Sequence, residues 1–393
     1  MKQRLRALYR ARRRGFGAHA PARTVTVHAD ALSLAGTIEP KRILVVRMDG
    51  LGDFLLSLRA FAHLRTSFPD SFLELLVDPA NADLAAATRL FDAVHPFAYF
   101  PSEPGGRRAS DADLQRVVTT LNLGEFDVAI DMRHYGSTRR FVAVIPACFR
   151  AGFRARKKDA TFDLLLPDFD QLPDGKRVHV STRHMLLAAA VVDSFGRSAG
   201  THPVRNTLPD LAWRGSGQGT QPKIVINPYS GRAIKNWPEA HYAELIRDLQ
   251  STIQADVAIF GETPDVRNGT RETFTIIPGV TDLGTRLPFG ELAGVLCGAD
   301  LYIGNDSGTT HLAAMLGVPT LAVMSGDVDA EVWRPIGERA TVLVGDAPCA
   351  PCFLNALKRC PNAHACMTSV TPQVMAQAAR DLLDRARAEP SQG

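Results

Sequence analysis

Residues 303–320, IGNDSGTTHLAAMLGVPT, indicate the fold class of this chain. A short apolar run over 299–303 precedes a polar segment over 305–311, and the apolar residues of 312–316 then recur at helical spacing. Gly317 and Pro319 together form a stop signal for the helix. The pattern therefore predicts a buried strand, a turn, a short helix and a further strand.

The polar segment is expected to begin the helix, with Asp306 or Ser307 as its N-cap. The free N–H groups of the first helical turn carry the positive end of the helix dipole, and they lie above the carboxyl end of the preceding strand. In a parallel α/β sheet, phosphate and sugar ligands bind there. His311 follows Ser307 by four residues and falls on the same helical face. Asp306, Ser307, Gly308 and His311 are therefore candidate binding residues.

Strand and helix signals alternate through two halves of the sequence. Buried strands are predicted at 43–46, 73–77, 127–130, 224–226, 256–260, 301–303 and 320–324, with helical periodicity between them. This alternation predicts an α/β fold with two Rossmann-like, doubly wound domains of parallel strands. Ligands would bind in the cleft that the carboxyl ends of the two sheets face.

The weakly patterned segment 206–222 is rich in Gly, Pro, Thr and Gln and is typical of a linker. It would separate an N-terminal domain over 41–205 from a C-terminal domain over 223–393. Residues 1–40 are expected to be a basic N-terminal extension.

Charge is unevenly distributed along the chain. Residues 1–14 hold seven Lys and Arg residues and no acid, so the net charge of +4 becomes −3 once these seven charges are set aside. The remainder is therefore not a general polyanion binder, and no nucleic-acid partner is expected. The extension is expected either to be a solvated, disordered tail or to lie on an anionic membrane surface as a short basic helix.

The sequence predicts a cytoplasmic protein, peripheral at the inner membrane if the extension binds lipid. It has no run of the roughly 18–20 apolar residues that span a bilayer, and no apolar segment typical of a secretory signal follows the N-terminal charges.

Asp53 is the first candidate for chemistry. It follows the strand 43–46 within RMDGLGDF, where Gly50 and Gly52 allow a tight turn. The pattern is not G-x-G-x-x-G, so no dinucleotide fingerprint is present. Asp53 is either a plain helix N-cap or a carboxylate that accepts a proton from an attacking hydroxyl.

The segment 227–238, NPYSGRAIKNWP, follows the first strand of the second half. Its Ser230-Gly231 turn and Lys235 suit a diphosphate, because N–H groups and hydroxyls donate to phosphate oxygens and the ammonium adds a point charge. The helix after it is expected to begin with Pro238 as its first residue. Asp265, in a loop after the strand 256–260, is a further candidate for contacts with hydroxyl groups.

Three arginines, Arg133, Arg139 and Arg140, follow the strand 127–130. They are either solvated loop residues or contacts for acidic groups of an acceptor.

Taken in order, these segments resemble glycosyltransferase family 9, the heptosyltransferases, over roughly residues 41–385. The matching features are Gly52-Asp53 after a strand, the K-x-W-P pattern of Lys235 to Pro238, and the D-S-G-x-x-H pattern of Asp306 to His311. The resemblance implies a GT-B fold with the nucleotide-sugar donor in the C-terminal domain and the acceptor in the N-terminal domain. The donor would be ADP-heptose, and the acceptor a glycan or glycolipid of the lipopolysaccharide-core type.

The resemblance also implies roles for individual residues. Asp53 would deprotonate the acceptor hydroxyl in an inverting transfer. Ser230, Gly231 and Lys235 would hold the donor diphosphate, the 306–308 turn with His311 would contact phosphate and sugar, and Asp265 would lie near the nucleoside. No D-x-D pair occurs at the predicted diphosphate site, so we expect a metal-independent reaction with no required cofactor.

Four cysteines cluster at 349–366: Cys349, Cys352, Cys360 and Cys366. Their spacing predicts a structural zinc site, a redox-sensitive clip or four reduced, separately packed thiols, and a cytoplasmic setting disfavours permanent disulfides.

Two other functions remain open from the sequence. The first is a sugar-nucleotide epimerase of the same fold, which would turn over a nucleotide-sugar alone. The second is a non-catalytic, membrane-peripheral protein that binds a nucleotide-sugar.

Overall fold

The computed structural model describes residues 26–27, 39–100, 110–154, 161–167, 169–172, 174–197, 221–261 and 272–388. Asp265 and residues 206–220 of the predicted linker lie outside the described residues. Thr26 and Val27 form a strand, so the extension is not uniformly without structure. The remainder of residues 1–38 lies outside the described residues.

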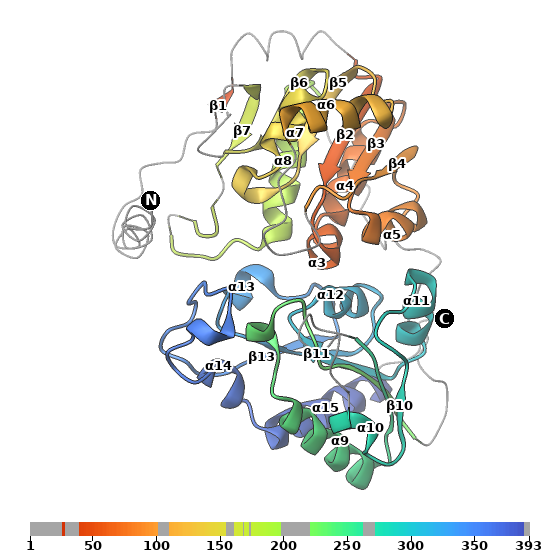
Figure 1. Cartoon of the computed structure of the whole chain (residues 1–393), viewed down its shortest axis with the longest axis vertical. Coiled ribbons are helices and arrows are strands. Elements are labelled where there is room, and N and C mark those ends of the chain that lie inside the picture. Colours follow the sequence, from red (N-terminus) through yellow and green to blue (C-terminus); the bar gives the residue numbers. More distant parts are fainter. Residues whose placement is uncertain are drawn as a thin grey trace.

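The first half contains a seven-stranded sheet in the order β1-β7-β6-β5-β2-β3-β4, parallel except for β1 (Figure 1). Its elements are β1 (Thr26–Val27), β2 (Arg42–Arg47), α3 (Leu51–Leu55), α4 (Leu58–Ser67), β3 (Phe72–Val77), η1 (Pro79–Asn81), α5 (Ala82–Ala87), β4 (Ala93–Pro96), α6 (Asp111–Thr120), β5 (Phe126–Asp131), η2 (His134–Gly136), α7 (Arg139–Val144), β6 (Ala147–Phe153), β7 (Leu164–Leu166) and α8 (Val180–Ser194).

The second half contains a fully parallel six-stranded sheet in the order β10-β9-β8-β11-β12-β13. Its elements are β8 (Lys223–Asn227), η4 (Ala233–Lys235), α9 (Glu239–Ile253), β9 (Asp256–Ile259), α10 (Glu272–Thr275), β10 (Val280–Asp282), α11 (Phe289–Cys297), β11 (Leu301–Asn305), α12 (Gly308–Met315), β12 (Thr320–Met324), α13 (Ala330–Trp333), β13 (Ala340–Val344), η5 (Leu357–Arg359), α14 (Ala365–Thr368) and α15 (Pro372–Ala388).

All seven strands predicted from apolar runs are present, and the opening stretch folds as strand, turn, helix and strand. Ser307 takes the N-cap position of α12. Pro238 is the N-cap of α9, one position earlier than predicted. The segment of helical periodicity between the first two predicted strands contains two helices, α3 and α4, because the chain turns at Leu56 and Ser57.

Helices cover both faces of both sheets. In the second half, α9 and α15 pack against one face, and α11 and α12 lie against the other. The α11–α12 layer is continuous with apolar residues of the first half, so one core extends across both halves. Figure 1 shows α3 at the lower edge of the first half, opposite α12. The carboxyl ends of β2 and β11 are thus brought to the junction of the two halves.

Candidate active site

Two glycines allow α3 and α12 to approach closely. A Cβ atom added to Gly308 would lie 2.6 Å from Leu51 Cβ and 3.0 Å from the Gly52 nitrogen. A Cβ atom added to Gly52 would lie 3.0 Å from His311 Cδ2. Real Cβ atoms are essentially never found as close as 2.6 Å to another atom, so a side chain at Gly308 would force the helices apart, and a side chain at Gly52 would require the His311 ring to shift. The contact places Asp53, on α3, beside His311, on α12.

The Asp53 carboxyl group is held by Arg47 but remains partly exposed to solvent. Arg47, at the end of β2, donates from Nη2 to the Asp53 carbonyl at 2.9 Å and to Asp53 Oδ1 at 3.3 Å. The Asp53 side chain keeps 39% of its surface exposed. Burial raises the pKa of Asp53 above its usual range, and the charge of Arg47 partly opposes this shift. These features suit a group that accepts a proton from a substrate.

Asn305, at the end of β11, fixes the loop that carries the predicted diphosphate residues. Its Oδ1 accepts hydrogen bonds from the Trp237 backbone N–H at 2.9 Å and the Tyr242 hydroxyl at 3.1 Å, and its Nδ2 donates to the Pro228 carbonyl at 2.8 Å. Asn305 is fully buried, so these bonds are shielded from water. Sequence reasoning missed this role, although a polar residue directly after a buried strand was a usable signal.

The two halves of the predicted donor site meet beside α12. Lys235 Nζ forms an ion pair with Asp306 Oδ2, and His311 Nε2 lies 3.8 Å from Asp306 Oδ1. Burial would raise the pKa of Asp306, but Lys235 and His311 outweigh it and hold this pKa well below its usual range. The carboxylate therefore stays ionised and keeps Lys235 next to the N-terminus of α12.

Hydroxyl groups complete this region. Ser307 Oγ lies 2.9 Å from Thr309 Oγ1 and 3.1 Å from Thr310 Oγ1, and the Tyr302 hydroxyl lies 2.8 Å from Thr309 Oγ1. The Ser307 side chain makes no capping hydrogen bond, which leaves the first N–H groups of α12 without that partner. His311 Nδ1 is buried and has no hydrogen-bond partner among the residues that the structure places.

Ser230 and Gly231 lie in the turn before Lys235. Ser230 Oγ lies 2.9 Å from Arg232 O and 2.7 Å from Asn236 Oδ1, either of which can accept its hydrogen bond, and the Ser230 backbone N–H donates to the same Asn236 oxygen at 2.8 Å. Space is open where a Gly231 Cβ would lie. The turn is therefore held in shape by its own side chains.

The three candidate acceptor arginines have different environments. Arg133 pairs with Asp49 and lies 4.1 Å from the centre of the Phe100 ring, with 22% of its side chain exposed. Arg140 is partly buried on α7. Arg139 is 1% exposed and forms a 2.8 Å ion pair with the buried Asp131. This guanidinium belongs to the core, so we withdraw Arg139 as an acceptor contact.

The four clustered cysteines influence one another electrostatically. Burial raises the pKa of Cys366, and the neighbouring thiols of Cys352, Cys360 and Cys349 raise it further. Across the described ranges, however, no three His, Cys, Asp or Glu side chains are arranged to hold a metal ion. The cysteine-rich segment instead contacts the loop that carries Lys235: His364 Nε2 lies 2.7 Å from the Ile234 carbonyl oxygen.

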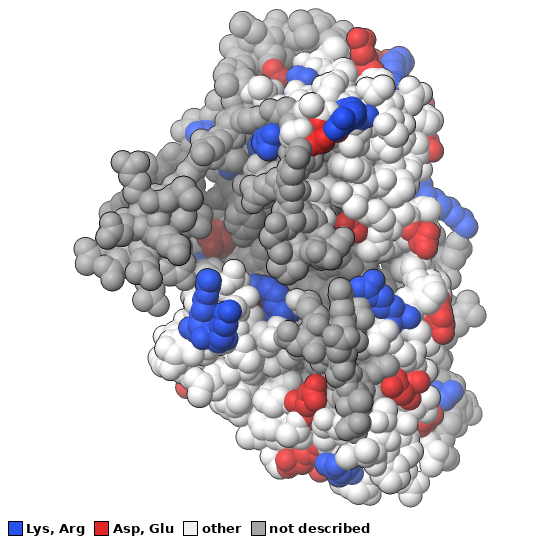
Figure 2. All heavy atoms as spheres, in the orientation of Figure 1, with Lys and Arg blue, Asp and Glu red and all other residues white. Residues whose placement is uncertain are grey.

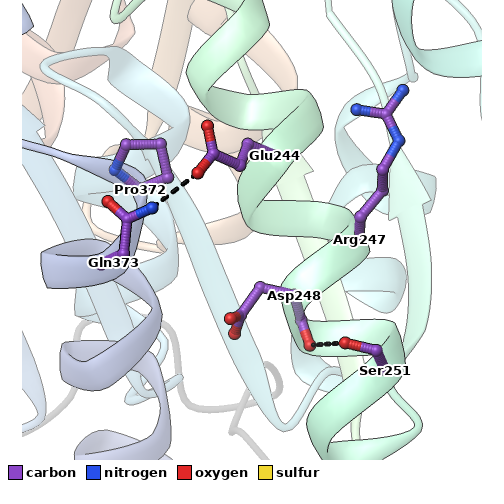
Figure 3. A pocket seen from close by; sticks show the side chains of 6 residues that line it. All are labelled: Glu244, Arg247, Asp248, Ser251, Pro372 and Gln373. Atoms are coloured by element: carbon purple, nitrogen blue, oxygen red, sulfur yellow. Dashed lines mark hydrogen bonds between the residues drawn. The ribbon is translucent and has the colours of Figure 1, made fainter.

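A surface pocket of about 360 Å³ lies elsewhere, between α9 and α15 (Figure 3). Its lining includes Glu244, Asp248 and Gln373, and Gln373 donates to Glu244 at 2.6 Å. None of the predicted site residues lines this pocket. On the face seen in Figure 2, Lys and Arg side chains lie along the boundary between the two halves.

The fold is that of a GT-B-type protein with two Rossmann-like domains. Their junction brings the Asp53 carboxylate close to Lys235 and the N-terminus of α12. A family model described as glycosyltransferase family 9 (heptosyltransferase) matches residues 114–362, more than half of the chain. The chain belongs to this family of glycosyltransferases.

Individual relatives are distant. Lipopolysaccharide heptosyltransferase 1 of Pseudomonas aeruginosa is 24% identical over 325 residues, which cover 79% of this chain and 86% of the relative. Lipooligosaccharide heptosyltransferase 2 of Campylobacter jejuni is 27% identical over 166 residues, which cover 41% of this chain and only 50% of that relative. The solved structure of E. coli heptosyltransferase WaaC with ADP has a TM-score of 0.63 at 19% identity, covering 87% of this chain and 99% of that structure.

Proposed function

We propose that this protein transfers heptose from ADP-heptose, with inversion, to a glycan or glycolipid acceptor of the lipopolysaccharide-core type. The observation that carries the proposal is the contact between α3 and α12, because it puts Asp53 of one half beside the Lys235–Asp306–His311 group of the other. Family membership supports the class of reaction. The WaaC structure, which contains ADP, supports the choice of nucleotide.

In the proposed reaction, the Asp53 carboxylate takes the proton of an acceptor hydroxyl. The hydroxyl oxygen forms a bond to the anomeric carbon of the donor sugar while the bond from that carbon to the diphosphate oxygen breaks. ADP leaves with the electron pair of the broken bond. The configuration at the anomeric carbon is inverted, because the acceptor oxygen attacks one face of this carbon while ADP leaves from the opposite face. The charge that develops on the leaving diphosphate is stabilised by Lys235 and by the N–H groups of α12.

Within this proposal, Ser230, Gly231 and Lys235 hold the diphosphate, and Asp306, Ser307, Gly308 and His311 contact phosphate and sugar. Arg133 and Arg140 remain as acceptor contacts. Asp265 would lie near the nucleoside. The reaction would need no metal cofactor.

The first test is calorimetric titration of the purified protein with ADP-heptose, ADP, UDP and GDP in the absence of added metal. Preferential binding of ADP and ADP-heptose supports the proposal, and a preference for UDP or GDP refutes the choice of donor. Turnover of ADP-heptose without an acceptor would indicate an epimerase. Transfer to a heptose-deficient lipopolysaccharide core, followed by assignment of the new glycosidic linkage, tests acceptor and inversion.

The location of the protein is a separate proposal. Among the described residues, no helix is long and apolar enough to cross a membrane. We propose a cytoplasmic protein, and contact of residues 1–14 with the inner membrane is tested by sedimentation with anionic vesicles, compared with a chain that lacks these residues.

The structural zinc site also remains a proposal, since thiols must move to form it. Metal analysis of protein purified without chelators tests it: about one zinc per chain, lost in a Cys352→Ser and Cys360→Ser double variant, supports it. A metal-free, folded protein contradicts it.

A further inference from the structure

Four charged side chains of alternating sign form a continuous chain that ends at Asp53. Arg133 Nη1 pairs with Asp49 Oδ1, and Arg47 Nη1 lies 3.1 Å from Asp49 Oδ2. Arg47 Nη2 then lies 3.3 Å from Asp53 Oδ1. Asp49 and Arg47 thus connect a residue at the surface of the first half to the carboxyl group at the domain junction.

The middle of this chain is buried and its ends are not. Arg47 is 1% exposed and Asp49 is 9% exposed, whereas Arg133 and Asp53 remain partly accessible. Charges in the interior interact more strongly than charges in water, because less solvent screens them. A change of charge at Asp49 or Arg47 should therefore alter the electrostatic environment of the Asp53 carboxyl group.

The position of Arg47 is fixed by the backbone as well as by the two carboxylates. Its Nη1 donates to the Met132 carbonyl at 2.7 Å, just beyond β5, and its Nη2 donates to the Asp53 carbonyl at 2.9 Å. Arg47 therefore ties α3 to the neighbouring strand end. Asp49 shares the same guanidinium with Asp53, so the two carboxylates compete for one cation.

We propose that Asp49 and Arg47 are positioning residues for sugar transfer: through the guanidinium group that Asp49 and Asp53 share, they hold the Asp53 carboxylate in place at the domain junction. This inference rests on the proposed role of Asp53 as the base. Neither residue needs to touch either substrate.

The groups that face Asp53 come from three directions. Arg47 and Asp49 lie at and after the end of β2, Arg133 lies after the end of β5, and His311 lies on α12. Burial raises the pKa of Asp53, Arg47 lowers it, Asp49 raises it, and Arg133 and His311 lower it. Removing the charge of Asp49 should therefore have the opposite effect to removing the charge of Arg47.

The test is the pH dependence of kcat/KM for sugar transfer by the full chain. The acid limb of this profile reports the pKa of the base in the free enzyme. Asp49→Asn should move this limb to lower pH by about one unit, and Arg47→Gln should move it to higher pH by about one unit. Arg133→Gln should move it upward by a smaller amount. The affinity for ADP, measured by calorimetry, should stay within about twofold in all three variants.

Arg116→Gln is the matched control, because Arg116 forms an exposed ion pair with Asp113 in the same half, away from Asp53. Its profile should coincide with that of the wild type. If Arg47→Gln does not fold, Arg47→Lys replaces it, and the limb should then shift less than one unit. Profiles that do not move, or that move in the same direction for Asp49→Asn and Arg47→Gln, overturn the inference.

Failure of the proposed function gives a different result. If the wild-type protein transfers no sugar, or if Asp53→Asn is fully active, Asp53 is not the base and the proposed function fails first. If the wild type is active and depends on Asp53 but the profiles stay fixed, only the role of Asp49 and Arg47 is refuted.

Discussion

Replacing Gly308 with alanine should separate the two helices that bring the site together. The new Cβ would lie 2.6 Å from Leu51 Cβ and 3.0 Å from the Gly52 nitrogen. Optimal contact between carbon atoms is near 3.6 Å, so α12 and α3 must move apart by about 1 Å. Overpacking of this kind typically costs about 1–3 kcal/mol of stability.

The effect on catalysis should be larger than the effect on nucleotide binding. A displacement of about 1 Å can reduce the rate by about 100-fold, because Asp53 would no longer face the sugar held by α12. The added methyl points toward Leu51, on the other half, so the affinity for ADP should change by less than about tenfold. Steady-state transfer assays give kcat/KM, and calorimetry gives the ADP affinity.

Gly294→Ala is the matched control, because Gly294 is an exposed residue within α11 and nothing lies within 4 Å of its added Cβ. In this control, alanine should stabilise the helix by up to about 1 kcal/mol and leave transfer unchanged. Urea denaturation measures the free energy of unfolding of both variants, which should fall in Gly308→Ala and rise in Gly294→Ala. Wild-type kcat/KM in Gly308→Ala would show that the α3–α12 contact is not needed for catalysis.

Three further outcomes are expected. Asp53→Asn should lower kcat by about 10²–10⁴ and leave ADP binding intact in calorimetry, because it removes a base and no donor contact; equal losses in both would contradict this assignment. The pKa of Asp306 is held below its usual value of 3.8, so this carboxylate contributes stability that is present above that pH and is lost as the pH falls below it. The difference in free energy of unfolding between wild type and Asp306→Asn, measured by urea denaturation, should thus be largest near neutral pH and become smaller toward pH 3. A difference that stays constant with pH would refute a stabilising role for the ionised Asp306. Asn305→Ala should destabilise the protein by about 2–4 kcal/mol, since it leaves several buried polar groups without partners; a loss under about 0.5 kcal/mol in urea denaturation would count against this role.

Much of the fold could be predicted because its signals are local. The central strands are apolar runs bounded by Gly, Pro and polar residues, and each of those predicted lies in one of the two sheets. The strands that were missed are β1, β4, β6, β7, β10 and β13. β1, β4, β7 and β10 have only two to four residues, β13 lies at a sheet edge, and the longer β6 has an apolar run that Arg150 interrupts. Edge strands need fewer apolar residues, so their sequences resemble loops.

The sequence by itself determined which residue types stand at the carboxyl ends of the parallel strands. Asp53, Lys235 and Asp306 were predicted as site residues in this way, because glycines and polar residues after an apolar run are a pattern within a few positions of the chain. The same local pattern could not show whether a charged residue is paired. From the sequence, Arg139 was either a solvated loop residue or an acceptor contact, but in the structure it forms a buried ion pair with Asp131.

Only the tertiary structure decided how the two halves meet. Gly52 and Gly308 are 256 positions apart in the chain, and their close approach depends on how the domains pack. The pairs between Arg133 and Asp49 and between Lys235 and Asp306 each lie within one half, and they depend on how distant segments of that half pack together. Such contacts join residues that have no local signal for one another, because their proximity depends on how strands, helices and the shared apolar core pack and not on neighbouring residues in the chain.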